Sequence, residues 1–385
     1  MLPSTPTRPL LGSKTPLFLH PQQTFCNFFN KNPNSQMGTK PFSSKSPSSL
    51  PAEAHRTTDA EAAISLQEWQ GWGTISPVPS MVKQVIQDLK LLEKDIDSEM
   101  TFDGNHGKLS GDFKVHEDKK HRAKYASLGN SEEKLQFFSA RQIACRLLGS
   151  RGYLCQKCWL PLEDCMCSKV TTCSLWHKLR IWLYMHPKDF LRQNNTGKLL
   201  WQVYGVQAAS LCLFGIVEHE EMMWNELNHA GRNKVWCLYP NKNAVTESVK
   251  DGVGSAVDPA NEDGIMHFIL IDGTWSNSNA MFRRLQDRAK LVWGQELRCI
   301  SLNTGVSLMH KLRPQPSWDR TCTAAAAIGL LYELQLVPEF RSFGLEKQAE
   351  AVETALEVLL KALTARRLRM GRSISRRERH NRDIC

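Results

Sequence analysis

The sequence predicts an α/β fold in which helices flank a parallel β-sheet. Short apolar segments of strand length alternate with longer segments whose apolar residues recur at helical spacing, between residues 178 and 367 of the 385. This alternation is typical of parallel sheets, because each crossover between parallel strands needs a connection long enough to hold a helix. The apolar runs are too short and too interrupted to span a bilayer, so no membrane association is expected.

Each element of this fold is predicted from its own pattern. Strands are expected at 178–186, 234–240, 267–272 and around 298–303. The segment 195–214 is interpreted as a loop followed by a helix. Further helices are expected at 276–289, 322–335 and 345–367, the last of them long and amphipathic.

A helical extension of residues 51–149 is expected to precede this domain. Apolar residues at helical spacing predict helices at 82–96 and 131–148. Ser131 is a candidate cap for the second helix, although Lys134 stands where a capping box would have a glutamate. The segment 104–124 lacks periodicity and is interpreted as an exposed linker.

Residues 1–50 have the composition of an organelle transit peptide. They contain no aspartate or glutamate, five lysines or arginines and thirteen serines or threonines. A plain disordered tail is the alternative interpretation. A transit peptide would direct the protein to a plastid or mitochondrion, and otherwise the cytoplasm or nucleus is expected.

The charge balance favours a polyanionic partner. Lysine and arginine outnumber aspartate and glutamate, 49 to 39, for a formal net charge of +10. Part of the excess lies in a basic C-terminal tail, 364–385, with eight arginines and two acids. This tail is interpreted either as a contact to RNA phosphates or as a solvated helix end, where cations offset the helix dipole.

Four of the twelve cysteines predict a structural metal site. Cys155, Cys158, Cys165 and Cys167 follow the spacing C-x2-C-x6-C-x-C. Paired thiolates on tight turns can close on one tetrahedral Zn²⁺, and four protein ligands leave no open position for catalysis. Free buried thiols or disulfides are the alternatives. The remaining cysteines are scattered, which favours a reducing compartment over a secreted, disulfide-bonded protein.

Polar residues follow the first strand in a loop that leads into a helix. Arg192, Asn195, Thr196 and Gly197 precede the helical segment. A helix start presents free N–H groups that favour an anion, but asparagine or threonine there can equally serve as an ordinary cap. The loop does not have the glycine spacing of a Walker A motif.

The motif Asp-Gly-Thr-Trp lies at the end of the strand 267–272. In open α/β sheets ligands bind beyond the carboxyl ends of the strands, which is where Asp272 is expected. Ser276 or Asn277 is expected to cap the following helix, and Arg283 and Arg284 are candidates for a phosphate backbone. A haloacid-dehalogenase phosphatase is excluded, because its nucleophilic aspartate would occupy position 270, which is leucine.

The order of these motifs resembles the DTW-domain family. The cysteine cluster is followed by His186-Pro187, the Asn195-Thr196-Gly197 loop, Leu-Tyr-Pro at 238–240, Asp-Gly-Thr-Trp, and Leu-Arg-Pro-Gln-Pro at 312–316. The resemblance implies a SPOUT-like fold for a domain of residues 150–363. It is similar to the eukaryotic branch that modifies the D-loop of tRNA, and a plant source would fit the first 50 residues.

The best-known members of that family are tRNA-uridine aminocarboxypropyltransferases. The resemblance therefore implies transfer of a 3-amino-3-carboxypropyl group from S-adenosylmethionine to N3 of a tRNA uridine. The implied catalytic residues are Asp272, Thr274 and Trp275. The implied donor-binding residues are His186, Asn195, Thr196 and Gly197, and the implied RNA contacts are Arg192, Arg283 and Arg284.

One departure from the family pattern concerns residues 321–327. Many relatives have a Ser-Thr-x-Glu-Ala run where this chain has TCTAAAA, so the glutamate is missing. Three other functions stay open at this point: a SPOUT-type methyltransferase, a transferase acting on ribosomal RNA, and a non-catalytic zinc-containing RNA-binding protein. No obligate protein partner is expected.

Overall fold

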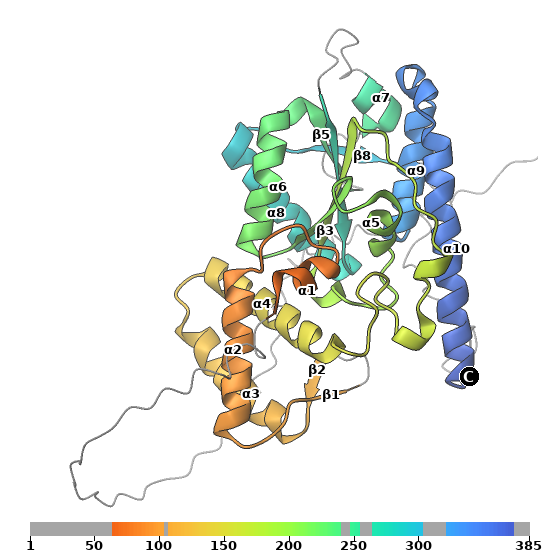
Figure 1. Cartoon of the computed structure of the whole chain (residues 1–385). Coiled ribbons are helices and arrows are strands. Elements are labelled where there is room, and N and C mark those ends of the chain that lie inside the picture. The colour runs from red at the N-terminus through yellow and green to blue at the C-terminus, as the bar shows by residue number, and fades with distance from the viewer. Residues whose placement is uncertain (1–63, 104–106, 240–246, 255–263, 303–320, 373–385) are drawn as a thin grey trace, which may run out of the picture. The chain divides into compact units, whose positions relative to one another are not determined.

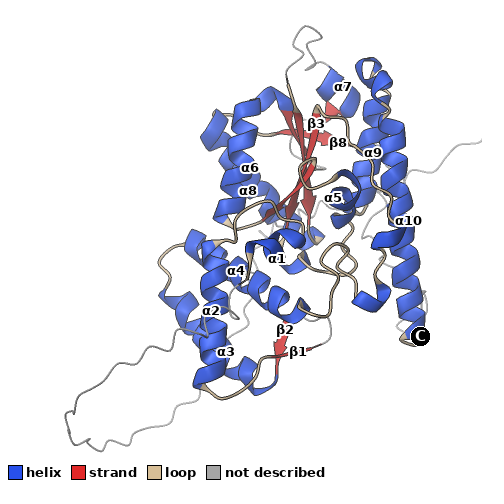
Figure 2. Cartoon of the chain, in the orientation of Figure 1, coloured by secondary structure: helices blue, strands red, loops and turns tan. Residues whose placement is uncertain are grey.

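The computed structural model describes residues 64–103, 107–239, 247–254, 264–302 and 321–372. Within these ranges, helices flank a parallel sheet with the strand order β4-β3-β7-β5-β8-β6 (Figures 1 and 2). This confirms the predicted α/β class. The strands are β3 (Leu179–Met185), β4 (Ala209–Leu213), β5 (Val235–Leu238), β6 (Glu247–Ser248), β7 (Met266–Asp272) and β8 (Arg298–Ser301).

Helices cover both faces of the sheet, so β3, β4 and β7 are buried on both sides. In β3, Ile181 and Leu183 point into one core, whereas Trp182 and Tyr184 point into the other. The first core includes α5 (Lys198–Tyr204), α9 (Thr323–Gln335) and α10 (Leu345–Arg369), and the second includes α6 (Val217–Ala230) and α8 (Trp275–Trp293). Burial on both faces explains why the strands are continuous apolar runs without polar alternation.

The segment 195–214 differs from the predicted loop and helix. Its helix α5 ends at Tyr204, Gly205 follows with φ 85°, and β4 then begins at Ala209. Every residue of β4 is buried. A short, fully buried strand has no alternation that separates it from a helix, which is why periodicity missed it. No helix was predicted for the segment that forms α6.

In the described residues, the extension before the sheet contains four helices and a small hairpin. They are α1 (Leu66–Gly71), α2 (Ser80–Asp95), β1 (Thr101–Asp103), β2 (Lys108–Ser110), α3 (Gly111–Ser127) and α4 (Ser131–Ser150). The predicted linker 104–124 was wrong for its larger part, which is α3. Because α3 is charged around most of its circumference and buries only Phe113 and Glu117, it has almost no apolar periodicity.

The α4 helix is capped one residue earlier than Ser131. The Asn130 side chain accepts a hydrogen bond from the Glu133 backbone N–H at 2.8 Å, and the Glu133 carboxylate accepts from the Gly129 N–H at 3.2 Å. This is a reciprocal cap that uses asparagine and glutamate. The expected cap at Ser131 was therefore wrong, and the missing glutamate lies one position before Lys134.

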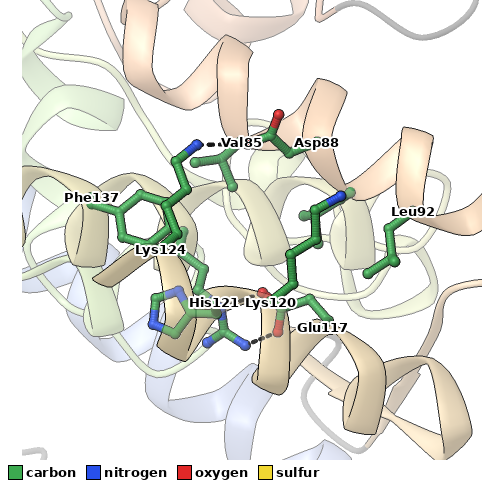
Figure 3. A pocket seen from close by; sticks show the side chains of 10 residues that line it. Val85, Asp88, Leu92, Glu117, Lys120, His121, Lys124 and Phe137 are labelled. Carbon is green, nitrogen blue, oxygen red and sulfur yellow. Dashed lines mark hydrogen bonds and ion pairs between the residues drawn. The ribbon is translucent and has the colours of Figure 1, made fainter. Parts of the chain in front are cut away.

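A small cavity lies among α2, α3 and α4 (Figure 3). Its volume is about 40 Å³, and its wall includes the Lys124–Asp88 ion pair at 2.8 Å and the stacked rings of His121 and Phe137. Small-molecule sites usually enclose several hundred Å³. This cavity is therefore a packing gap in the extension and is too small to be a ligand site.

The extension is joined to the sheet domain through α6. The Trp69 indole N–H donates to Ser76 Oγ at 3.2 Å, and that oxygen lies 2.8 Å from His219 Nε2 in α6. Glu218 accepts bonds from the backbone and the hydroxyl of Ser80 at the start of α2. Apolar residues of the extension and of the sheet domain also share one continuous hydrophobic core that runs from Ile64 to the last helix. None of the described helices is long and apolar enough to cross a membrane.

Three buried histidines are held in their neutral form. Burial lowers the pKa of His186, His219 and His267 to about 4 in each case. In each ring Nδ1 accepts a hydrogen bond, from the Lys188 N–H, the Leu213 N–H and the Trp182 indole respectively. Protonation would therefore break a buried hydrogen bond.

We predict that the free energy of unfolding decreases as the pH falls from about 6.5 to about 4. The folded pKa lies below the unfolded value near 6.5, so the unfolded state binds more protons in this window. The expected loss is roughly 1–2 kcal/mol per histidine between pH 7 and pH 5. Urea unfolding across this range measures it. His267→Gln should reduce the pH dependence, whereas the same change at the exposed His116 should not.

Candidate functional site

The candidate site lies where two neighbouring strands end. Met185 and Asp272 are partners in the parallel register of β3 and β7. From β3 the chain runs through α5 to β4 on one side, and from β7 it runs through α8 to β8 on the other. Such a switch point opens a crevice beyond the carboxyl ends of the strands, which is the usual ligand site of an open α/β sheet.

The Asp272 carboxylate is fixed at this point by the loop that follows β3. Its side chain is buried, and both carboxylate oxygens accept hydrogen bonds from Asn195 Nδ2 at 3.0 Å. Asn195 Oδ1 in turn accepts from the Lys198 backbone N–H at 3.1 Å. One amide therefore caps α5 and positions the acid, as the capping interpretation expects, whereas the anion contact of this loop stays a prediction.

Gly197 is required because the loop passes against the carboxylate. A Cβ atom at this position would lie 2.0 Å from Asp272 Oδ2. Real Cβ atoms do not approach an oxygen so closely, so any side chain would displace either the loop or Asp272. The backbone of Gly197 is ordinary right-handed helix, so the requirement comes from space and not from conformation.

The other polar groups of the loop also bind within the protein. Thr196 Oγ1 accepts from the Ala324 backbone N–H at 3.3 Å, at the start of α9. The buried Lys198 ammonium donates to the Gln193 carbonyl at 2.6 Å. The loop thus connects β3, β7 and α9. Its side chains serve first to build the site, and α5, with seven residues, is too short to offer an extended anion-binding end.

His186 completes the floor of the site beside Asp272. Its backbone N–H donates to the Asp272 carbonyl at 2.8 Å, and its ring stacks on Phe214 with 5.8 Å between centroids. Because Nδ1 accepts from the Lys188 N–H and burial lowers the ring's pKa to about 4, the neutral ring carries its proton on Nε2. His186 is therefore a hydrogen-bond donor at neutral pH.

Thr274 and Trp275 lie at the start of α8. The helix begins at Trp275, and Thr274 is its N-cap, with its hydroxyl 2.9 Å from Ser276 Oγ. The expectation that Ser276 or Asn277 caps this helix was wrong, because both residues already lie in its first turn. Trp275 is half-buried and lies three positions after Asp272.

The three arginines predicted to bind RNA have different surroundings. Arg283 is exposed on α8. Arg192 is half-buried and donates to Asp189 at 2.6 Å. Arg284 forms ion pairs with Glu132 at 2.5 Å and with Glu220 at 2.6 Å, so its guanidinium is bound between α4 and α6. Arg284 thus connects the extension to the sheet domain, and its charge is already compensated.

The four predicted cysteines converge on one point. Their sulfurs all lie within 4.8 Å of one another, with Sγ–Sγ distances of 3.5 Å (Cys155–Cys165), 3.7 Å (Cys155–Cys167) and 3.9 Å (Cys158–Cys165). Four thiolates about 2.3 Å from a tetrahedral ion would be about 3.8 Å apart. The cluster therefore fits a metal ion without rearrangement, and a disulfide, which needs about 2 Å, is absent among these cysteines.

The acids within the cysteine motif bind the last helix. Asp164 forms ion pairs with Arg366 at 3.3 Å and with Arg369 at 2.8 Å, and Glu163 forms one with Arg369 at 3.1 Å. The predicted basic tail from 364 belongs to α10 up to Arg369. Two of its arginines form ion pairs with acids of the same chain. Residues 373–385 lie outside the described residues, as do residues 1–50 and 312–316.

Sequence reasoning missed two charged residues near His186. Asp189 ends the short 3-10 helix Pro187–Asp189 and is almost completely buried. The sequence could have indicated Asp189, because it lies three residues after His186, in the polar loop that follows the strand. Arg146 lies on α4, outside every motif, and its sequence surroundings give no sign of a role.

We predict that the purified protein carries about one zinc ion per chain. Cys158→Ser should abolish stoichiometric zinc and lower the thermal unfolding midpoint, because a structural ion contributes directly to folding. Elemental analysis and thermal unfolding measure the two effects. Cys173→Ser is the matched control, since its thiol donates to the Ser174 carbonyl and lies outside the cluster. Four titratable thiols and no metal in folded protein would contradict the assignment.

We predict that Gly197→Ala destabilises the protein by roughly 1–3 kcal/mol, because a methyl group must displace the Asp272 carboxylate or the loop. Urea unfolding measures this. Gly129→Ala is the control, because nothing lies within 4 Å of a Cβ at that glycine. Equal stability of the two variants would show that the loop does not approach Asp272 as described.

Comparison with known proteins agrees with this arrangement. The DTW domain, as a family model, matches residues 152–368, which is more than half of the chain. The match includes the cysteine cluster, the loop after β3 and the residues from Asp272 to Trp275. No solved structure matches the chain. On the family match, this chain is a member of the DTW-domain family.

Proposed function

We propose that the protein transfers the 3-amino-3-carboxypropyl group from S-adenosylmethionine to N3 of a uridine in tRNA, with methylthioadenosine as coproduct. The observation that carries this proposal is the buried Asp272 carboxylate, held by Asn195 at the switch point of the sheet in a member of the DTW-domain family. A carboxylate fixed in a crevice suits a nucleophile whose N–H must be oriented and deprotonated.

The reaction balances with a single proton transfer. A bond forms between uridine N3 and the methylene carbon next to the sulfonium, and the bond from that carbon to sulfur breaks. Its electron pair stays on sulfur, which becomes the neutral thioether of methylthioadenosine. The N3 proton leaves to a base. Since the sulfonium activates three carbons, the carbon held in line with N3 determines which group moves.

Asp272 is proposed to accept the N3–H of the uracil. Both of its oxygens already accept from Asn195, so the carboxylate has a fixed orientation when the base arrives. Removing the negative charge while keeping the shape would leave the site without a base for the N3 proton. A proton acceptor positioned in this way contributes on the order of 10²–10⁴ to a rate.

His186 and Trp275 are proposed to hold the uracil ring. The neutral His186 ring has a donor at Nε2, and uracil has carbonyl acceptors on both sides of N3. Trp275, half-buried at the start of α8, offers an indole face on which a splayed-out base can stack. Thr274 adds a hydroxyl at the same helix start.

The tRNA backbone is proposed to contact the exposed Arg283 and the outer part of Arg192. Such contacts are independent of sequence and sensitive to salt. Arg284 is not included, because Glu132 and Glu220 already bind it. A zinc ion held by the four cysteines would fix the loop that meets α10. Modification of the tRNA D-loop, as in the eukaryotic branch of the family, is the substrate that we propose to test first.

We predict that purified protein, incubated with S-adenosylmethionine and unmodified tRNA transcript, yields methylthioadenosine and aminocarboxypropyl-uridine. Mass spectrometry of the nucleosides and small molecules measures both. Asp272→Asn should lower the rate by roughly 10²-fold or more. Asp287→Asn, the same change at an exposed position of α8, should not.

Other products would decide against the proposal. S-adenosylhomocysteine with a methylated base would indicate a methyltransferase. Binding of tRNA without any coproduct, in wild type and Asp272→Asn alike, would indicate a non-catalytic RNA-binding protein. Product on ribosomal RNA fragments, with none on tRNA, would keep the chemistry and change the substrate.

A further inference from the structure

Asp189 presents a buried carboxylate oxygen that has no partner. The residue lies three positions after His186, and its backbone N–H donates to the His186 carbonyl at 2.8 Å. The side chain is 3% exposed. One oxygen, Oδ1, accepts from Arg192 at 2.6 Å, whereas Oδ2 is buried and accepts no hydrogen bond from the described residues. Leaving such an oxygen unpaired is costly, so a cationic donor is expected to bind there.

Arg146, on the neighbouring helix α4, has a buried donor without an acceptor in the described part of the chain. It lies on α4, which packs against the short helix that carries Asp189, and its Nε is buried without an acceptor among the described residues. Burial lowers the pKa of Arg146. The nearby Asp189 carboxylate raises this pKa, and the nearby Arg192 lowers it further. The side chain passes Gly107, where a Cβ would lie 2.8 Å from Arg146 Cγ.

The two groups are neighbours but do not satisfy each other. No ion pair within 4.0 Å joins Arg146 to Asp189 in the described part of the chain, although both elements pack together. Asp189 Oδ2 and Arg146 Nε are therefore both buried without a hydrogen-bond partner among the described residues, on two elements that pack together. Together with Arg192, the three side chains carry one excess positive charge.

An α-amino acid group complements this arrangement better than a simple ion. A phosphate would pair with Arg146 but would be repelled by Asp189, and an amine alone would leave Arg146 unpaired. A group with an ammonium and a carboxylate on one carbon satisfies both, with charge-assisted hydrogen bonds at each end. The side chains of Asn195 and Thr196, in contrast, already bind within the protein.

We infer that Asp189 and Arg146 bind the α-ammonium and α-carboxylate of the donor's amino-acid end. This subsite rests on the proposed function, because it assigns a place to the part of S-adenosylmethionine that is transferred. Anchoring that end next to His186 would hold the connected methylene carbon close to Asp272. Arg146 precedes the family match at residue 152, so the extension would complete the site and not only support it.

The test compares two thioether ligands that differ in the amino-acid substituent. S-adenosylhomocysteine has it, and methylthioadenosine has a methyl group instead. Calorimetric titration of the full chain should show that Asp189→Asn and Arg146→Gln each weaken S-adenosylhomocysteine binding by about 10- to 100-fold. Both variants should bind methylthioadenosine within about twofold of wild type.

Lys188→Gln is the matched control, since it removes an exposed charge from the same short helix and should change neither affinity more than about twofold. Circular dichroism checks that each variant is folded. If Asp189→Asn does not fold, Arg146→Gln, at a half-buried position, still tests the subsite. Unchanged binding of both ligands by the variants, or equal weakening of both, would overturn the subsite. Binding of S-adenosylhomocysteine by wild type would in that case still support the proposed donor. If wild type binds neither ligand, the donor assignment fails and the subsite fails with it.

Discussion

The contact between Asn195 and Asp272 is the constraint on which the site depends. It joins the loop after β3 to the end of β7, and it exists only because Gly197 lets the backbone approach within the space that a Cβ would occupy. The same asparagine caps α5, so a change in the loop would alter both the acid and the first crossover. Local backbone geometry and the position of the acid are therefore set by one side chain.

A second level of organisation comes from the extension. It is bound to the sheet domain through one buried polar contact, Ser76 with His219, and through two that are more exposed, Ser80 with Glu218 and Glu132 with Arg284. The buried contact fixes direction as well as distance, because a misplaced partner would leave a buried donor or acceptor unsatisfied. The loops at the carboxyl ends of β3 and β7 are thereby held from the extension side.

The cysteine cluster and the last helix fix the other flank. A metal ion would close the loop 155–167, and Asp164 of that loop forms ion pairs with Arg366 and Arg369. Arg366 also donates to the Tyr153 hydroxyl at 2.8 Å. The end of α10 is therefore connected to the start of the DTW domain, which brings the two ends of the family match together in space.

Much of the site was visible in the sequence because it lies at strand ends. A buried apolar run followed by an acid, or by a histidine and a polar loop, indicates the carboxyl edge of a sheet, and the spacing of four cysteines indicates a metal. The fold class followed from the alternation of strands and helices. The charged helix α3 and the strand β4 did not, because neither has the periodicity that separates one element from another.

The sequence by itself determined the class of the fold, the metal cluster and the strand ends that carry Asp272 and His186. Only the tertiary structure decided which polar groups are already bound. Arg284 resembles an RNA contact in the sequence but is held by two glutamates, while Asp189 and Arg146 are 43 positions apart along the chain and become neighbours through packing of α4. The physical reason is that charge compensation and burial depend on distance in space, and a one-dimensional pattern carries no information about it.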